Sequence, residues 1–167
     1  DGADGWIDED APVAAGDRTA TALVAERNAR DLFPGTTVVL RFGQLIGPDS
    51  GLTLADIEQA RTGVSPSLGR RDAYQPTVWL DDAAAAVVAA LGAPAGTYNV
   101  VDAEPPTRGE IDAALAAAVG QPALRPALEE VPPALETIAR SQRVSSARLR
   151  DATGWVARVR AGTDGWT

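Results

Sequence analysis

The side chains that could perform chemistry in this chain are carboxylates, hydroxyls and arginines. All 15 cationic residues among the 167 are arginine, and the sequence contains no histidine and no cysteine. These absences exclude a Schiff-base lysine, a phosphate-loop lysine, a histidine-based triad, a thiol nucleophile, a disulfide framework and the usual zinc ligands. We therefore expect no metal site, and any catalysis must use acids, hydroxyls, arginine or the backbone.

The most obvious pair of carboxylates is Asp81-Asp82, which precedes an apolar stretch. Adjacent residues at a strand-to-helix junction point in different directions, so a shared-proton dyad is disfavoured and capping of the following helix is favoured. A second pair, Glu129-Glu130, is interpreted as a solvated surface pair.

The acidic residues at positions 1–10 resemble the middle of a calcium-binding EF-hand loop. If Gly5 is the turn glycine of such a loop, its third position is Gly2 and its twelfth is Ala11, so two of the required ligands are absent. We interpret residues 1–16 as a solvated acidic loop.

Arg41 is the one charged residue inside an apolar, β-branched run over positions 36–42. A buried guanidinium needs a carboxylate or carbonyl partner. Two interpretations are open: Arg41 forms a structural ion pair, or it belongs to a ligand pocket.

Apolar patterning and turn signals predict an alternating α/β order with few strands. Thr53 with Asp56, three residues later, forms one candidate capping box at a helix start. Thr107 with Glu110 forms a second one. The predicted helices cover residues 19–32, 53–62, 83–91, 107–120, 132–140 and 145–153, and the predicted strands cover residues 36–42, 76–80 and 97–101.

Three strands are too few for the apolar surface that this chain must cover. The helix over 83–91 is apolar on all sides, and the strand over 36–42 lacks clean alternation, a pattern typical of burial on both faces. We expect a single domain over residues 1–167 with an incomplete parallel sheet, completed by an upstream segment or a partner chain. The absence of methionine, with Asp1 in first place, independently suggests a fragment.

Composition also bears on partners and compartment. A formal charge of -8 and a pI near 4.5 disfavour nucleic acid, because such binding depends on Lys and Arg that release counterions. The longest apolar run, residues 83–91, is about half of the ~20 residues that a membrane helix needs, and no signal-peptide pattern opens the chain. We expect a soluble cytoplasmic protein with neither a nucleic-acid nor a membrane partner.

Five segments follow the same order as the motifs of a known family. Residues 38–48 read VVLRFGQLIGP, residues 71–72 read RD, residues 77–83 read TVWLDDA, residues 96–100 read GTYNV, and residues 144–155 begin with VSSARL and end with GW. Together they resemble the NAD(P)-dependent epimerase/dehydratase family of extended and atypical short-chain dehydrogenases. The resemblance implies the C-terminal, substrate-binding part of a Rossmann-like doubly wound fold, with the nucleotide-binding half upstream of residue 1.

The resemblance also implies a cofactor, NAD or NADP, and a small-molecule substrate. Phe42 and Gly43 match positions along the nicotinamide side of the cofactor. Gln44 matches a substrate-facing asparagine, and either amide can bond a hydroxyl or a carbonyl.

A loop that closes over the substrate in the relatives is matched here by residues near position 73. Arg71, Tyr74 and Gln75 are therefore expected to contact the substrate. Tyr74 is also a candidate for a substitute general acid.

The sequence departs from the family at its redox pair. The family's Tyr-x-x-x-Lys motif falls on Arg18 and Ala22, and the histidine of its His-Val-Asp-Asp motif is Trp79. We expect an NAD(P)-dependent oxidoreductase of the epimerase/dehydratase type, acting on a small carbonyl or sugar-like substrate and inactive as this part alone. The alternatives are a non-catalytic dinucleotide-binding regulator and a half domain completed by a partner chain. A homodimer is a further alternative for the partner.

Overall fold

The computed structural model describes residues 5–13 and 17–166, excluding the side chains of residues 17 and 18. Every strand pair is parallel, so the chain has the α/β class that the sequence predicts. The elements follow one another as β1 (Trp6–Ile7), α1 (Asp17–Leu32), β2 (Val38–Phe42), β3 (Gln44–Ile46), α2 (Gly51–Arg61), β4 (Thr77–Trp79), α3 (Leu80–Ala90), β5 (Gly96–Val100), α4 (Arg108–Ala118), a 3₁₀ turn (Pro133–Leu135), α5 (Glu136–Ala139), β6 (Arg143–Val144), α6 (Ala147–Thr153) and α7 (Ala161–Asp164).

The parallel strands form three two-stranded pairs, β1 with β6, β2 with β5 and β3 with β4. The chain changes partner at Gly43, because the residues before it pair with β5 and those after it pair with β4. A Cβ at Gly43 would lie 2.8 Å from the carbonyl oxygen of Pro76, so only glycine permits this close crossing. The Gly43 N–H donates to the Val100 carbonyl and the Gln44 N–H donates to the Pro76 carbonyl. The predicted strand over 36–42 is confirmed, but its continuation into β3 was not predicted.

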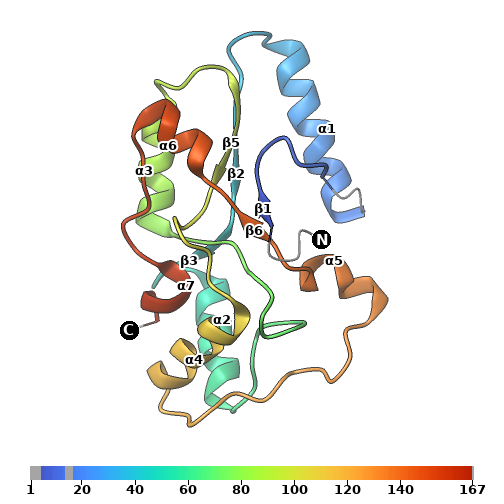
Figure 1. The fold of residues 1–167 in the computed structure, drawn as a ribbon, viewed down its shortest axis with the longest axis vertical. Helices are drawn as coiled ribbons and strands as arrows, with labels where there is room; N and C mark the ends of the chain where they lie inside the picture. Colours follow the sequence, from blue (N-terminus) through green and yellow to red (C-terminus); the bar gives the residue numbers. More distant parts are fainter. Residues whose placement is uncertain (1–4, 14–16, 167) are drawn as a thin grey trace.

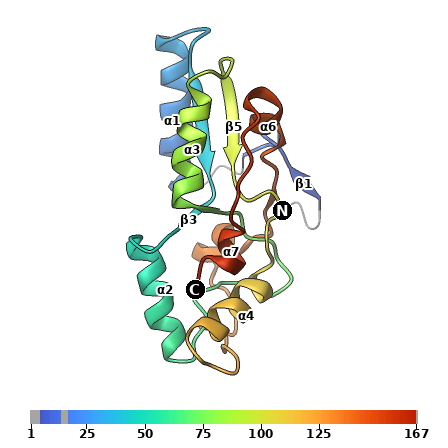
Figure 2. The same ribbon diagram turned by 90° about the vertical axis from the view of Figure 1, so that its left-hand side faces the viewer.

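Two apolar clusters hold these elements together. Figure 1 shows α3 and α6 on one side of the β2–β5 pair and α1 on the other, next to β2. Figure 2 shows α2, α4 and α7 gathered beneath the pair. The upper cluster includes Val78, Tyr98, Val100, Leu149 and Trp155. The lower cluster includes Ile46, Ile111, Leu115, Leu124 and Trp166.

Of the two predicted capping boxes, one is present at a helix start and the other is not. Thr107 and Glu110 form the predicted capping box at the start of α4. The predicted box of Thr53 and Asp56 is wrong, because α2 begins earlier and Ser50 caps it by accepting a hydrogen bond from the Thr53 N–H. Because the cap lies about one turn earlier than predicted, Asp56 lies in the middle of α2 and does not take part in capping.

Asp81 and Asp82 do not cap α3, contrary to the prediction. The helix begins at Leu80, its N-cap residue is Trp79 without a side-chain cap, and both aspartates lie in the first turn. Asp82 is buried and accepts hydrogen bonds from the backbone of Arg158 and Val159 at 2.8 and 2.9 Å, and from the Arg158 side chain at 2.9 Å. Its carboxylate therefore anchors the C-terminal segment to α3.

A second buried carboxylate, Asp102, lies just beyond β5. Its Oδ2 accepts a hydrogen bond from the Thr77 hydroxyl at 2.6 Å and one from the Gly162 N–H at 3.4 Å. Its Oδ1 has no hydrogen-bond partner among the described residues. Burial raises the pKa of Asp102 to about 6, against the opposing effect of the Thr77 hydrogen bond.

The sequence suggested that the segment before α1 is a solvated loop, but part of it is paired and buried. Trp6 and Ile7 pair in parallel with β6, and the Arg143 guanidinium lies 4.4 Å from the centre of the Trp6 ring. Glu9 is buried and accepts a hydrogen bond at 2.7 Å from the backbone N–H of Asn99 in β5. Tertiary pairing with a segment more than 130 positions away could not be read from local composition. The calcium-like pattern extends over residues 1–4, which lie outside the described residues.

The β2 edge, α1 and the end of α3 are less covered than the two apolar clusters. Across the described chain, β2 has a single ladder partner, β5, and α1 lies next to β2 (Figure 1). No residue of α1 from Thr19 to Leu32 is buried. On α3, Val88 and Leu91, its C-cap residue, are 69% and 84% exposed, although the sequence predicted a helix covered on several faces.

Candidate functional site

Two adjoining cavities lie where the carboxyl ends of β2 and β5 meet the start of β3. Ligands of open parallel sheets bind at this end of the strands. The cavities share Phe42, Gly43, Pro76 and Gln142 in their walls. The crossing at Gly43 therefore places one short piece of backbone between both spaces.

The first, which we call the strand-end cavity, has a volume of about 290 Å³. It lies beneath residues 7–13 and the start of α1, and the segment 137–144 closes another side. Its polar side chains include Arg41 from β2 and Asn99 from β5. The Asn99 side chain is itself fixed by a 3.2 Å hydrogen bond from its amide nitrogen to the Ser145 carbonyl.

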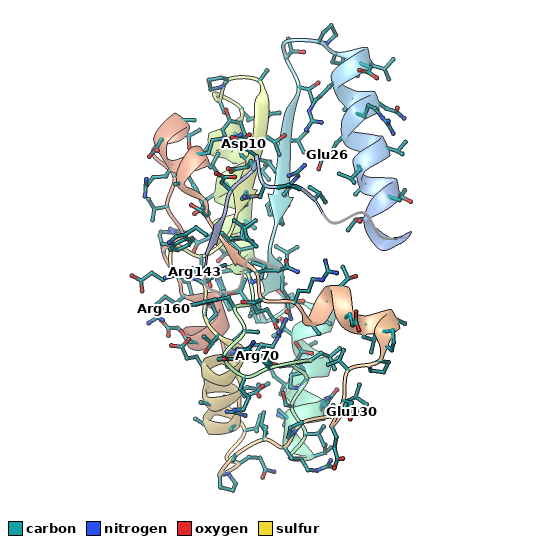
Figure 3. All side chains as sticks on the ribbon, turned by 45° about the vertical axis from the view of Figure 1, so that its right-hand side comes forward. Asp10, Glu26, Arg70, Glu130, Arg143 and Arg160 are labelled. Atoms are coloured by element: carbon teal, nitrogen blue, oxygen red, sulfur yellow. The ribbon has the colours of Figure 1, made fainter. Side chains whose placement is uncertain are left out.

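Arg41 fits both interpretations that the sequence left open, because it forms an ion pair and also lines this cavity. Its Nε and Nη2 each donate to Glu26 of α1 at 2.8 Å. The same Glu26 accepts from Arg30 at 3.1 Å. Figure 3 shows Glu26 on the side of α1 that faces β2. The guanidinium beside it lowers the pKa of Glu26 from its ordinary value.

The second, which we call the amide cavity, has a volume of about 370 Å³. Four polar side chains on one wall form a hydrogen-bonded chain: Asp56, Gln44, Gln75 and Arg108. Arg108 donates from Nε to the Gln75 Oε1 at 3.3 Å, and Gln75 donates to the Gln44 Oε1. Gln44 then donates to the Asp56 Oδ2 at 3.1 Å.

The two ends of this hydrogen-bonded chain are charged groups, of which Arg108 is buried and Asp56 is partly buried. Arg108 is 2% exposed, and its other donors bond the carbonyls of residues 138, 139 and 140 at 2.7 to 3.0 Å. Burial lowers the pKa of Arg108. At the other end, burial raises the pKa of Asp56 to about 6, although the Gln44 hydrogen bond opposes the rise.

A loop that frames the amide cavity is pinned by Asp112 of α4. Its Oδ1 accepts hydrogen bonds from the hydroxyls of Ser65 and Ser67 at 2.7 and 3.0 Å. Ser67 and its neighbours Pro66 and Leu68 line the cavity. Asp112 is buried, so these bonds fix the loop against α4.

The predicted site residues separate into two groups. Phe42 and Gly43 line both cavities, and Gln44 and Gln75 line the amide cavity, where they contact each other. Arg71 and Tyr74 line neither cavity.

Those two residues have structural partners elsewhere. Arg71 is exposed and pairs with Asp112 at 3.3 Å. The Tyr74 ring lies 4.9 Å from the Arg143 guanidinium, on which the Trp6 ring also lies. Tyr74 thus packs against Arg143 and is not among the residues that line either cavity.

The positions of the family's redox pair lie on α1. The side chain of Arg18 lies outside the described residues, and Ala22 is exposed. Trp79, which replaces the histidine, packs against the lower cluster. Among the described residues, no group of three or more acidic side chains is placed to hold a metal ion.

Sequence reasoning missed Asp56, Arg108 and Asn99 as cavity residues. Asp56 was assigned to a cap and Arg108 to the interior of a capping motif, so local roles concealed their tertiary ones. The one available signal was an arginine directly after a helix cap, a position where a cation opposes the helix dipole. Such a residue needs acceptors from another part of the chain.

Structural comparison relates this chain to known proteins at low sequence identity. A human epimerase family protein, SDR39U1, solved with NADPH, is 24% identical over 98% of this chain and 59% of its own, with a TM-score of 0.73. MoeE5 in complex with UDP-glucuronic acid and NAD is 18% identical over 98% and 57%, with a TM-score of 0.75. A UDP-glucuronic acid 4-epimerase from Bacillus cereus, solved with NAD, is 19% identical over 97% and 54%, with a TM-score of 0.72.

These likenesses establish the fold. The chain has the Rossmann-like fold of the epimerase and dehydratase structures and spans a little over half of their length. No protein-family model matches the sequence, and no curated protein matches it. Within the described residues, every helix is too short or too polar to cross a bilayer.

Proposed function

We propose that this chain forms the substrate-binding half of an NAD(P)-dependent oxidoreductase of the epimerase/dehydratase type. The observation that carries the proposal is the pair of cavities at the carboxyl ends of parallel strands, joined at Phe42 and Gly43. The similar structures hold NADPH, or NAD together with UDP-glucuronic acid in one case. We assign a small carbonyl or sugar-like substrate to the amide cavity, because its two glutamines offer donors and acceptors to hydroxyls and carbonyls.

This chain offers a contact surface for only one end of the cofactor, beside the strand-end cavity. Phe42 is 41% exposed at the end of β2, so its ring offers an apolar surface to a flat heterocycle, and the polar groups of Asn99 lie nearby. When bound, NAD or NADP would accept or supply the hydride. The chain's own residues would orient the substrate and exclude water, since the sequence has no glycine-rich phosphate loop.

The rest of the nucleotide-binding domain must come from outside this chain, as a second part of the proposal. Three features of the described residues support it: the single ladder of β2, the lack of buried residues over 19–32 of α1, and the exposed apolar side chains of Val88 and Leu91. An unpaired strand edge accepts another strand through its backbone groups. The outer edge of β5 differs from the free edge of β2, because the Asn99 N–H of β5 already donates to Glu9. We therefore place the added strand beside β2.

A non-catalytic dinucleotide-binding regulator is the second candidate. It is favoured by the replacement of the Tyr-x-x-x-Lys pair with Arg18 and Ala22, which can neither donate the proton nor lower the donor's pKa. The contact of Tyr74 with Arg143, outside the lining of both cavities, also favours this candidate.

The two candidates separate in one experiment on the full-length protein. NADPH binding is measured by fluorescence, and its oxidation is then followed with a panel of carbonyl and keto-sugar substrates. Binding with oxidation supports the enzyme, binding without oxidation supports the regulator, and no binding of NADPH or NAD contradicts both. A Phe42→Ala variant should weaken cofactor binding, whereas Glu58→Ala, at an exposed position of α2, should leave it unchanged.

A further inference from the structure

The polar wall of the amide cavity is one chain of hydrogen bonds with a charge at each end. It begins at the buried Arg108 guanidinium, passes through Gln75 and Gln44, and ends at the Asp56 carboxyl. The four residues come from α4, the loop before β4, β3 and α2. Four separate parts of the fold therefore meet to build this wall.

The charges at the two ends determine the direction of the chain. A guanidinium can only donate, and an ionised carboxylate can only accept. Gln75 must therefore turn its oxygen to Arg108, and Gln44 must turn its nitrogen to Asp56. With both ends fixed, the two amides lie head to tail, and each keeps one N–H and one oxygen lone pair for a ligand.

We propose that Asp56 is a positioning residue of the amide cavity, which holds both glutamine amides in the one orientation that a substrate hydroxyl or carbonyl meets. The inference rests on the proposed function in that it takes this cavity as the substrate site. Asp56 acts through Gln44 and is not itself assigned a proton-transfer role.

The other charged groups around Asp56 are engaged with different partners. On its own helix, Glu58 pairs with Arg61. On α4, Asp112 accepts from Ser65, Ser67 and Arg71, and Glu110 accepts from the Thr107 backbone. Trp166 and Ile111, which line the same cavity, carry no charge. The polarity of the amide chain is thus decided by Asp56 and Arg108.

The first test is an NMR titration of the full-length protein. Ionisation of Asp56, whose pKa burial raises to about 6, should shift the side-chain amide signals of Gln44 and Gln75 together, with one midpoint near pH 6. The Asp56→Asn variant should abolish both shifts. Gln121, which donates to the Arg61 carbonyl instead, is the internal control. A Gln75 signal that does not follow Asp56 would overturn the proposal.

The second test measures binding of UDP-glucuronic acid in the presence of NAD by calorimetry. Asp56→Ala leaves a Gln44 N–H without its acceptor and should weaken binding about tenfold, as expected for one lost hydrogen bond. Asp56→Asn keeps an acceptor oxygen and should bind within about twofold of the parent. The matched control is Glu58→Ala, on the exposed side of α2.

The two tests distinguish the possible failures. Equal affinity of Asp56→Ala and the parent would overturn the positioning role. If the parent does not bind UDP-glucuronic acid at all, the assignment of a sugar-like substrate to this cavity fails, and the amide titration still decides whether Asp56 orients the two glutamines.

Discussion

The Arg41 guanidinium grips both carboxylate oxygens of Glu26, with Nε and Nη2 each 2.8 Å from one oxygen. This two-point contact joins β2 to α1, a helix without buried residues from Thr19 to Leu32. Further hydrogen bonds between α1 and the strands include that from Arg30 to Thr97 of β5 at 2.7 Å. Polar contacts therefore contribute to the placement of α1 against β2.

Arg41→Ala should release α1 from β2. The partly buried Glu26 loses its main partner, so we expect a loss of about 1–3 kcal/mol in the free energy of unfolding and faster amide exchange throughout α1. Arg41→Lys should retain only part of this stability, because an ammonium cannot make both hydrogen bonds to the carboxylate in one plane. Arg61→Ala removes an exposed pair with Glu58 and should cost less than about 1 kcal/mol. Unchanged exchange in α1 of Arg41→Ala would contradict this role.

The same pair should fail in acid. The pKa of Glu26 is lowered in the folded protein by the Arg41 hydrogen bonds, so the folded state favours the ionised form. The stabilisation is complete above the ordinary value of 4.5 and is lost as the pH falls through the lower folded pKa. Exchange in α1 should accelerate over that range in the parent protein, and Glu26→Gln should remove the acid-dependent step.

Gly43→Ala should disrupt both cavities. The new Cβ would lie 2.8 Å from the Pro76 carbonyl oxygen, so the crossing of β2 and β3 must open, at a cost of about 1–3 kcal/mol. Cofactor binding should weaken with it. The control is Gly51→Ala at the start of α2, where a Cβ meets nothing within 4 Å and stability should be kept or slightly raised. Thermal unfolding and NADPH fluorescence give both readouts, and a Gly43→Ala protein as stable as Gly51→Ala would refute the close approach.

Asp102 should make the protein more stable at pH 5 than at pH 7. Burial raises its pKa to about 6 from an ordinary 3.8, so the folded state binds the proton more tightly than the unfolded state. Stability contributed by this group is present below the unfolded value and is lost as the pH rises through about 6. The change between pH 7 and pH 5 amounts to about 1 kcal/mol.

Asp102→Asn tests that assignment by chemical denaturation at both pH values. The variant keeps an acceptor for the Thr77 hydroxyl but cannot ionise, so its stability should vary less with pH over this range. A pH dependence equal to that of the parent would show that another group is responsible. Asp56, whose pKa is also raised to about 6, is the other candidate, and Asp56→Asn tests it.

Asp82→Ala should free the C-terminal segment. Two backbone N–H groups, of Arg158 and Val159, and the Arg158 guanidinium would lose their common acceptor, at a cost of about 2–4 kcal/mol. Trypsin should then cut after Arg158 and Arg160 faster than in the parent. Asp81→Ala, at the exposed neighbouring position, should leave the cleavage rate unchanged, and equal rates in the two variants would contradict the anchor.

The sequence by itself determined the local elements and the chemistry that this chain can use. Thr107 with Glu110 predicted the start of α4, and the β-branched run before Gly43 predicted β2, because caps and buried strands have short-range signatures. The motif resemblance indicated a Rossmann-like fold, and it selected Gln44 and Gln75 at the positions where the cavity wall lies.

The tertiary structure alone decided which carboxylates act and with what partners. Asp56 and Asp82 both looked like helix caps, since the residues next to a predicted helix start carry the only local information. One instead meets Gln44, 12 positions away, and the other meets Arg158, 76 positions away. Such contacts depend on how separate elements pack in space, and a pattern within one segment contains no record of the segment that will face it.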